Sequence, residues 1–265
     1  VGMAAMFAGP LIAGEAREFE SEHYLIATDI DVETAKRLAR HMDAMYAEYE
    51  RRLAGFGDPA DDRLRVWVFD RADDYVAFLA DCGIEARGTD GMFFDTAMRS
   101  GLSTWLGDRP VERIEQVLRH EGFHQFAWRR IGRTLPPWAG EGLAEYFGEA
   151  IVIDGNLKTG QISARRLRQV RSAVRAGRHV PFEQMLTLDP AAWAETIAMA
   201  DGRAALLYDQ AWSMAHFLIN ARPKLRQAFA DYLAHLSHGA TAREAFVRAF
   251  RTSDFDAFES RWRRY

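Results

Sequence analysis

The sequence predicts an α+β fold in which a small mixed α/β unit is packed on a mainly helical unit. Two observations lead to this fold class. Up to about residue 106, runs with strand-like alternation are interspersed with helical periodicity, whereas nearly every later segment has the periodicity of a helix. Apolar residues make up 48% of the 265 residues, so the chain can bury a core of substantial size. The boundary is expected at residues 107–110, where a glycine and a proline interrupt both patterns.

The N-terminal subdomain, residues 17–107, is predicted to combine strands and helices. Alternating apolar residues predict a strand over 18–30, and Asp31 is a suitable N-cap for the amphipathic helix that continues to about residue 53. The other elements are a strand, a short helix and two short strands that can pair as a hairpin, over residues 63–70, 73–80, 91–94 and 100–106. The last of these strands, over residues 100–106, is either an edge strand, which binds extended peptides by strand addition, or an ordinary hairpin strand.

The C-terminal subdomain, residues 108–265, is predicted to be helical. Pro110 suits the first turn of a helix that continues to about residue 131. A second helix over 138–151 follows a short turn, and a hairpin is expected around residues 151–153. Further helices are predicted over residues 163–176, 202–221, 223–236, 241–250 and 253–262.

Residues 1–14, VGMAAMFAGPLIAG, are small and apolar and precede a charged segment. This pattern is typical of the end of a secretory signal, with small residues near Ala13 and Ala16 where cleavage can fall, but it lacks the positively charged start. Residues 1–16 are therefore either a signal-peptide remnant or a disordered N-terminus. The first alternative, which we favour slightly, implies an extracytoplasmic protein, either periplasmic or secreted.

Charge, apolar runs and the cysteine count limit which binding partners and which kinds of site are expected. The net charge is −4 and no block of like charge dominates, so nucleic acid is not an expected partner. The most basic stretch, residues 165–175, is interpreted as the solvated face of a helix rather than as a phosphate or polyanion site. No run approaches the roughly 20 apolar residues of a membrane span, so no transmembrane segment is expected. The single cysteine, Cys82, excludes an intrachain disulfide and a zinc site built from several thiolates.

The most informative segment is RHEGFHQ, residues 119–125, which contains the pattern His-Glu-x-x-His. Four residues along a helix place His120 and His124 on one face, one turn apart, so both imidazoles can reach one metal ion. Glu121 lies about 100° around the axis, where it can contact a water on the metal without binding the metal itself. The pattern therefore predicts a metal site with a carboxylate base beside it.

A third ligand is expected from the segment PPWAGEGLAEYF, residues 136–147. Glu141 lies near the start of the next predicted helix, after a short turn. Helices joined by a short loop pack antiparallel, so Glu141 can face His120 and His124. Two histidines, one glutamate and a water complete an open tetrahedral zinc site, which is typical of catalytic rather than structural zinc.

With these two segments, the chain resembles a gluzincin, a zinc peptidase in which the His-Glu-x-x-His helix is followed by a glutamate ligand on a second helix. Residues 138–146, WAGEGLAEY, are similar to the Trp-x-x-Glu-Gly-Phe-Ala-x-Tyr signature of M1-type aminopeptidases. The order of elements is closer to the uncharacterised peptidase-like family DUF1570, which has a strand like residues 21–28 and a later Tyr-x-Gln-x-Trp element like residues 208–212. This resemblance covers most of the chain.

One departure limits what the resemblance implies. M1 enzymes contain a Gly-x-Met-Glu-Asn segment that binds the amino terminus of the substrate. Residues 91–94, GMFF, lack that glutamate and asparagine. An aminopeptidase specificity is therefore not expected to carry over.

Two further residues are candidates for supporting roles. Tyr208 is the candidate donor to the oxyanion, because the resemblance to M1 enzymes implies a tyrosine about this far beyond the glutamate ligand. The alternatives are an aromatic core stripe, which Tyr208 and Trp212 share with His216, or His216 as the donor. Glu145, one turn after Glu141, is either a partner for the free nitrogen of a zinc-binding histidine or an exposed helix residue.

These observations predict a zinc-dependent metallopeptidase with one Zn²⁺ ion and a peptide or protein substrate. His120, His124 and Glu141 are the expected metal ligands, Glu121 is the expected general base, and Tyr208 the expected oxyanion donor. Three alternatives stay open: a non-catalytic zinc or peptide-binding module, a hydrolase of another amide such as a cell-wall bond, and a helical interaction domain without metal. The sequence does not indicate the cleavage specificity, the native metal or the oligomeric state.

Overall fold

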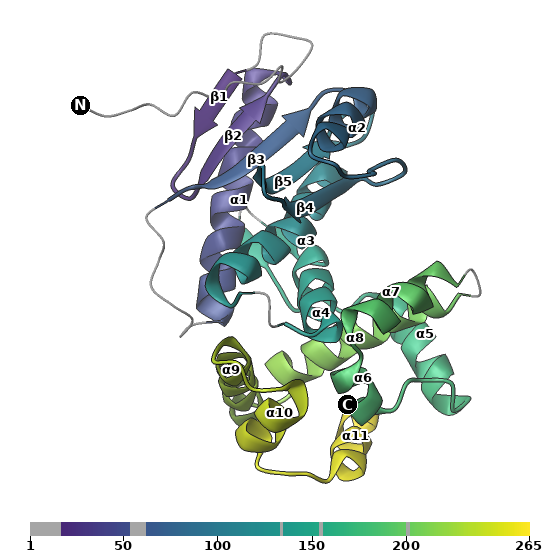
Figure 1. Cartoon of the computed structure of the whole chain (residues 1–265). Helices are drawn as coiled ribbons and strands as arrows, with labels where there is room; N and C mark the ends of the chain where they lie inside the picture. Colours follow the sequence, from purple (N-terminus) through teal and green to yellow (C-terminus); the bar gives the residue numbers. More distant parts are fainter. Residues whose placement is uncertain (1–16, 54–61, 133–134, 154–155, 200–201) are drawn as a thin grey trace. The chain divides into compact units, whose positions relative to one another are not determined.

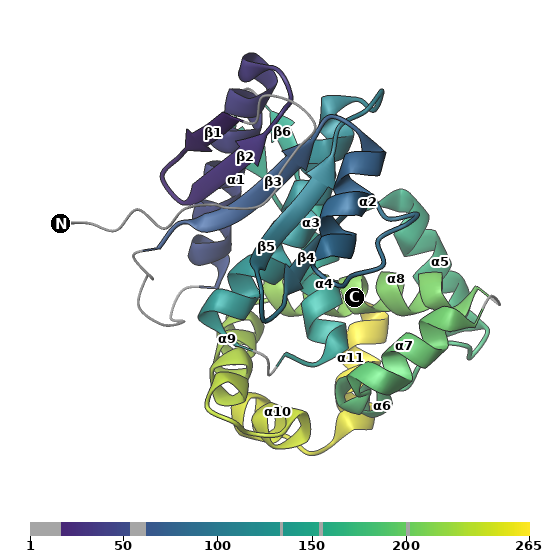
Figure 2. The ribbon, with the colours of Figure 1, turned by 45° about the horizontal axis from the view of Figure 1, so that its top comes forward.

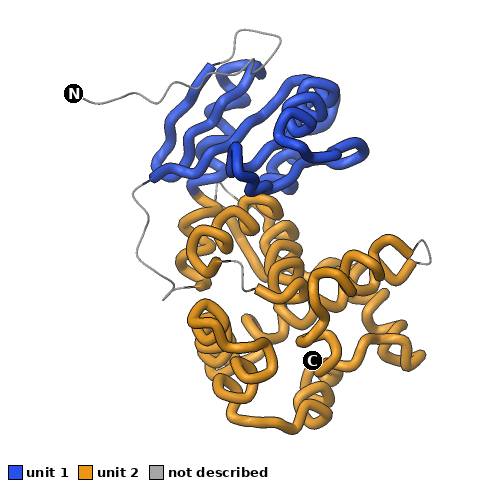
Figure 3. The backbone as a smooth tube through the Cα atoms, in the orientation of Figure 1, with its two compact units in different colours: residues 1–43, 62–118 blue, residues 44–61, 119–265 orange. Residues whose placement is uncertain are grey.

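The structure is a computed structural model that describes residues 17–53, 62–132, 135–153, 156–199 and 202–265. The chain divides into two compact units, shown in different colours in Figure 3. Unit 1 comprises residues 1–43 and 62–118, and unit 2 comprises residues 44–61 and 119–265. The signal-peptide remnant or disordered N-terminus expected at residues 1–16 lies outside the described residues.

Two continuous helices contribute residues to both units. These are α1 (Val32–Arg52), divided after residue 43, and α3 (Val111–Arg130), divided after residue 118. The expected boundary at residues 107–110 instead lies in the turn before α3.

The expected α+β class is confirmed, because a small N-terminal sheet is followed by a helical region (Figure 1). The sheet belongs to unit 1 and has the strand order β1-β2-β3-β5-β4. Its three central strands are parallel and align the buried residues Ile26, Val66 and Leu102, whereas β1 and β4 pair antiparallel at the two edges. The strands β1 to β5 span Arg17–Glu20, Tyr24–Thr28, Leu64–Phe69, Gly91–Asp95 and Ser100–Trp105.

The prediction of one strand over residues 18–30 is wrong, because the chain turns back and forms the antiparallel pair β1 and β2. The carboxylate of Asp43 in α1 holds this turn. It accepts hydrogen bonds from the Ser21 hydroxyl at 2.9 Å and from the backbone N–H of His23 at 3.0 Å. The partner that stabilises the turn lies about twenty residues away, so the local alternation of apolar residues does not reveal it.

The expected hairpin of β4 and β5 is confirmed, but β5 is not an edge strand. It lies between β3 and β4, with which it pairs in parallel and antiparallel fashion respectively. The edge strand on this side of the sheet is β4. Strand addition to residues 100–106 is therefore excluded by the neighbours that already occupy both sides of β5.

The two helices expected in the N-terminal part are present. Asp31 caps α1 as predicted, because its Oδ1 accepts hydrogen bonds from the N–H groups of Glu33 at 3.1 Å and Thr34 at 2.9 Å. Helix α2 (Ala72–Asp81) covers one face of the sheet, where the Phe78 ring lies 5.0 Å from Trp67. Helix α1 runs along the other face (Figures 1 and 2).

Each helix expected after residue 110 is present, together with the expected hairpin of β6 (Ile151–Ile153) and β7 (Asn156–Lys158). All of these elements belong to unit 2 except the part of α3 before residue 119. The second of these helices ends at Gly148, slightly earlier than expected, because β6 begins at Ile151. Helices α4, α5, α8, α9, α10 and α11 span Pro137–Gly148, Ala164–Arg175, Arg203–Asn220, Pro223–Ser237, Ala242–Phe250 and Phe255–Arg264.

Two short helices of unit 2 were not predicted: α6 (Phe182–Thr187) and α7 (Pro190–Ala198). Helix α6 has only six residues, too few for a clear period. Helix α7 begins with an aspartate N-cap followed by proline, and the Asp189 carboxylate accepts a hydrogen bond from the N–H of Ala192 at 2.8 Å. That Asp-Pro signal was available in the sequence and predicts a helix start.

Helix α4 packs closely against α8 (Figure 2). Gly142 makes this approach possible, because a Cβ atom at this position would lie 2.4 Å from the carbonyl oxygen of Ala211 in α8. The small residue thus brings the helix of Glu141 against the helix of Tyr208.

An aromatic cluster joins α3, α4 and the part of α1 that belongs to unit 2. The ring of Tyr49 meets Phe147 edge-on at 4.7 Å, and Phe123 stacks on Phe147 at 5.3 Å. All three side chains are fully buried. Rings of this size restrict how α3 and α4 can shift against each other.

Candidate metal centre

Helix α3 presents His120 and His124 one turn apart on the same face, as the sequence predicts. Neighbouring residues on other faces hold this turn in place. The hydroxyl of Tyr49 donates a hydrogen bond to the carbonyl oxygen of Arg119 at 2.7 Å, and Phe123 stacks on Phe147. The residue before each histidine is therefore held by a contact with another helix.

Helix α4 supplies the third member of the cluster. The helix begins at Pro137, and Glu141 follows one turn later. Its Oε2 atom lies 3.5 Å from Nε2 of His120 and 3.6 Å from Nε2 of His124. The two Nε2 atoms are 3.3 Å apart. The structure thus brings together the three residues that were expected to bind metal.

The dimensions of this triangle fit a divalent metal ion. Zinc binds nitrogen and oxygen ligands at about 2.0–2.2 Å, so two ligands at corners of a tetrahedron are separated by about 3.3–3.6 Å. The three separations in the cluster, 3.3, 3.5 and 3.6 Å, lie in this range. The three side chains keep roughly a fifth of their surface exposed, which leaves access for a fourth ligand.

The charges in the cluster also suit a cation. Burial of the His120 ring disfavours its charged form, but the Glu141 hydrogen bond and the surrounding carboxylates outweigh burial and raise the pKa of His120 to about 9. Burial likewise raises the pKa of Glu141, yet His124 and His120 together hold it well below its usual range. Glu141 is therefore ionised at neutral pH, and a metal ion would displace the proton on His120.

Glu121 lies next to His120 on α3 and is partly exposed. Its negative charge contributes to the raised pKa of His120 and also to that of Tyr208. The carboxylate is thus within electrostatic reach of both the metal cluster and the candidate oxyanion donor. The role of Glu121 as a general base stays a prediction.

Tyr208 projects from α8, and its ring packs edge-on against Trp193 of α7 at 5.6 Å. Burial and the charge of Glu141 raise the pKa of Tyr208 to about 12, with smaller contributions from Glu145 and Glu121. The phenol therefore stays protonated at neutral pH and acts as a hydrogen-bond donor. Tyr208 thus combines an aromatic contact with electrostatic interactions with three carboxylates.

The alternative donor, His216, is engaged elsewhere. Its Nε2 lies 3.2 Å from the carbonyl oxygen of Gly160, and its Nδ1 lies 3.0 Å from the hydroxyl of Tyr265. Its ring also packs against Trp212 at 5.6 Å. Burial lowers the pKa of His216, in spite of the Gly160 contact. Both ring nitrogens therefore have partners outside the metal cluster, which favours Tyr208 over His216.

Comparison with protein families finds a match to part of the chain. The family described as "Protein of unknown function (DUF1570)" matches residues 114–241. This match supports the DUF1570 family. A search of curated proteins found no match. The matched segment contains the three members of the metal cluster, Glu121 and Tyr208.

The matched segment also contains a buried arginine, Arg166. The stretch around it was expected to form a solvated basic face, but Arg166 is 8% exposed and contacts three carboxylates. Its guanidinium pairs with Glu145, with Glu149 at 2.7 Å and with Asp209 at 2.7 Å. Arg166 thereby joins α4, α5 and α8 through charge-assisted hydrogen bonds.

This arrangement changes the expected role of Glu145. Its carboxylate pairs with Arg166, and it acts on His120 through its charge. A periodic signal for the buried arginine was present in the sequence, because Arg166 lies on the same face of α5 as the buried Val170 and Ala173. The pattern was missed because a charged residue such as Arg166 is normally assigned to the exposed face of a helix.

The predicted lack of a transmembrane segment can be compared with the helices of the structure. No helix in the described part of the chain is both long and apolar enough to cross a membrane, in agreement with the expected lack of a transmembrane segment.

Proposed function

We propose that this protein is a zinc-dependent peptidase of the gluzincin type, which hydrolyses a peptide bond with metal-activated water. The observation that carries the proposal is the triangle of His120, His124 and Glu141, whose edges match a tetrahedral zinc site with one corner open. Glu121 and Tyr208, which lie within electrostatic reach of this triangle, supply the acid–base and donor groups that hydrolysis needs.

Each residue has a distinct task in this proposal. A bound zinc ion supplies a Lewis acid that lowers the pKa of water toward 7. The Glu121 carboxylate accepts the proton of the attacking water and then donates it to the leaving amine. His120, His124 and Glu141 hold the ion in place, and the buried pairing of Glu145 with Arg166 restrains the carboxylates of α4 around them.

Tyr208 acts on the carbonyl oxygen of the scissile bond. Because its pKa is raised to about 12, its hydroxyl keeps the proton that it donates as negative charge develops on that oxygen. These groups suit hydrolysis of an amide, which requires both a proton for the leaving amine and a donor for the oxyanion, and we propose a peptide or protein as the substrate.

The substitution Glu121→Gln tests the proposal. It removes the base and leaves the three metal-binding side chains, so we expect unchanged zinc content and a fall in kcat of about 100-fold or more. Zinc is measured by elemental analysis, and hydrolysis is measured by mass spectrometry on a mixed peptide library. Glu195→Gln, an exposed residue of α7, is the matched control and should leave both quantities unchanged.

Three results would contradict the proposal in different ways. Purified protein without zinc would favour a helical interaction domain. Zinc without cleavage of any peptide would favour a non-catalytic binding module or an enzyme acting on another amide, such as a cell-wall bond. Cleavage that survives Glu121→Gln would remove Glu121 from the mechanism.

A further inference from the structure

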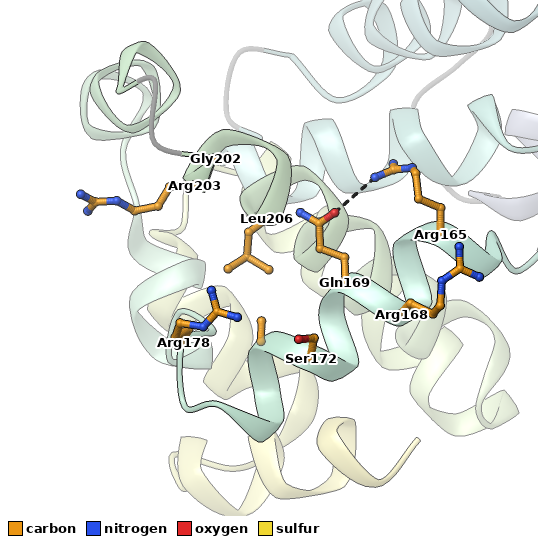
Figure 4. Close-up of a pocket in the computed structure, with 9 residues that line it drawn as sticks. Arg165, Arg168, Gln169, Ser172, Arg178, Gly202, Arg203 and Leu206 are labelled. Atoms are coloured by element: carbon orange, nitrogen blue, oxygen red, sulfur yellow. Dashed lines mark hydrogen bonds between the residues drawn. The ribbon is translucent and has the colours of Figure 1, made fainter.

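Unit 2 contains a strongly basic pocket of about 840 Å³ (Figure 4). Its walls come from α5, from the segment after α5 and from the start of α8. Four of its lining residues are arginines, and a glutamine and a serine add neutral hydrogen-bonding groups. The polar lining residues are Arg165, Arg168, Gln169, Ser172, Arg178 and Arg203.

The pocket keeps positive charge that is not neutralised by ion pairs with nearby carboxylates. Arg165 is held by Asp209, with both N–O distances at 3.1 Å. Arg168 and Arg178 are exposed, and neither pairs with a carboxylate among the residues that the structure describes. Exposed guanidinium groups in one concave surface attract carboxylates and phosphates, which they bind with paired N–H donors.

The basic surface extends beyond this pocket along α5. A second pocket of about 520 Å³ shares Arg168 and Ser172 with the first and adds Arg171 and Arg175. Helix α5 contains five arginines and no acidic residue. From residue 165 to residue 175 the helix rises by about 15 Å. We call this surface the basic track: Arg165, Arg168, Arg171, Arg175, Arg178 and Arg203.

The basic track is connected to the candidate catalytic residue Tyr208 through helix α8. Arg203 precedes Tyr208 on α8 by five residues, which correspond to a rise of about 7.5 Å along the axis and a rotation of about 140° around it. Arg165 pairs with Asp209, the residue directly after Tyr208. A peptide that contacts both the track and Tyr208 must therefore pass around α8.

We propose that the basic track binds an acidic segment of the polypeptide substrate, and this inference rests on the peptidase function proposed above. Its length suits a chain with several carboxylates rather than a single anion. Leu206 and Ala173 give the first pocket an apolar part, against which the methylene groups of glutamate can pack. The whole chain is acidic, with a net charge of −4, which disfavours a nucleic acid as the occupant.

The test measures binding without hydrolysis, in the Glu121→Gln protein. A fluorescent peptide containing a run of aspartate and glutamate is compared with the same peptide carrying asparagine and glutamine. We expect the acidic peptide to bind about tenfold more tightly or better, and its affinity to fall as salt is raised. Equal affinity for the two peptides would overturn the proposal.

Charge reversal locates the binding surface. Arg168→Glu combined with Arg178→Glu should weaken binding of the acidic peptide by about tenfold or more, because two exposed cations become anions. Lys224→Glu combined with Arg226→Glu makes the same change in net charge on exposed residues of α9 and should alter binding by less than about twofold. Circular dichroism checks that each variant is folded. Equal losses in the two double variants would show that net charge, and not the basic track, determines binding.

Two competitors separate the acidic peptide from other anions. Inorganic tripolyphosphate and a single-stranded oligonucleotide of similar length are added to the complex. Stronger binding of the oligonucleotide, or of tripolyphosphate, than of the peptide would overturn the assignment to polypeptide. Because this assay needs no turnover, loss of the peptidase function with retained peptide binding would identify a failure of the proposed function alone. Cleavage of neutral and acidic peptides with equal kcat/KM would instead refute only the role of the track in substrate choice.

Discussion

At the scale of single residues, the candidate site depends on groups whose protonation is set by their neighbours. Tyr208 and Glu141 illustrate this. Burial and nearby carboxylates raise the pKa of the Tyr208 phenol, whereas His124 and His120 lower the pKa of the Glu141 carboxyl in spite of its burial. Both shifts widen the range of pH over which each group keeps the form that its proposed task requires.

Replacement of Tyr208 by phenylalanine tests its role as the oxyanion donor. We expect kcat to fall by about 100-fold with little change in KM, because the hydrogen bond strengthens only as charge develops on the carbonyl oxygen. The pKa of about 12 is raised above the usual value, so the phenol is protonated at any lower pH. The ratio of wild-type to Tyr208→Phe activity should therefore be constant between about pH 6 and pH 10.

His216→Gln provides the comparison for this prediction. His216 has partners for both ring nitrogens outside the metal cluster, so folded His216→Gln protein should keep the activity of the wild type. Loss of activity in His216→Gln with retained activity in Tyr208→Phe would reverse the assignment of the donor.

At the scale of secondary-structure elements, the close approach of α4 and α8 controls the site. Helix α4 carries Glu141 and α8 carries Tyr208, so their separation sets the distance between the metal cluster and the donor. Gly142, which faces the backbone of Ala211, permits that separation.

Gly142→Ala should be destabilising by about 1–3 kcal/mol, because the new methyl group overlaps a backbone oxygen that cannot rotate away. The separation of α4 and α8 should increase, and the Tyr208-dependent part of kcat should fall with it. Gly140→Ala in the same helix has open space around the new methyl group and should be neutral or stabilising by up to about 1 kcal/mol. Urea unfolding of the two variants measures this difference. Equal stability in both would show that α4 and α8 are not in close contact.

At the scale of the whole molecule, metal binding should contribute to stability. A ligand present at about 100 times its dissociation constant stabilises the folded state by about 2.7 kcal/mol. For a chain of this size we expect Tm to rise by about 5 °C or more when zinc is added to EDTA-treated protein. Differential scanning calorimetry measures the shift.

His120→Ala should abolish that shift and lower the zinc content, because one of the three ligands is lost. His238→Ala, which changes an exposed histidine at the end of α9, should keep both the shift and the zinc. An equal zinc content in His120→Ala would exclude His120 as a ligand.

Sequence patterns predicted the helices and strands whose formation depends on residues close together in the chain. Periodicity within a single segment is enough to predict the strand at residues 63–70, the His120–His124 spacing and the helices after residue 110 other than α6 and α7. The strand prediction at residues 18–30 failed, and Arg166 was misplaced on a solvated surface, because both depend on distant carboxylates. Asp43 holds the turn between β1 and β2, and three carboxylates from α4 and α8 accommodate the charge of Arg166. Such partners become visible only when the folded chain brings them together.

The division of α3 between the two compact units affects metal binding by fragments that contain only one unit. The boundary follows residue 118, and His120 is only two residues beyond it. A fragment that begins at this boundary would place His120 in the first turn of a new helix, where the backbone N–H groups lack intrahelical partners and the end frays. Although every member of the metal triangle belongs to unit 2, the helical turn that carries its first histidine is completed by residues of unit 1. A truncated protein lacking unit 1 should therefore lose metal affinity without losing a single ligand.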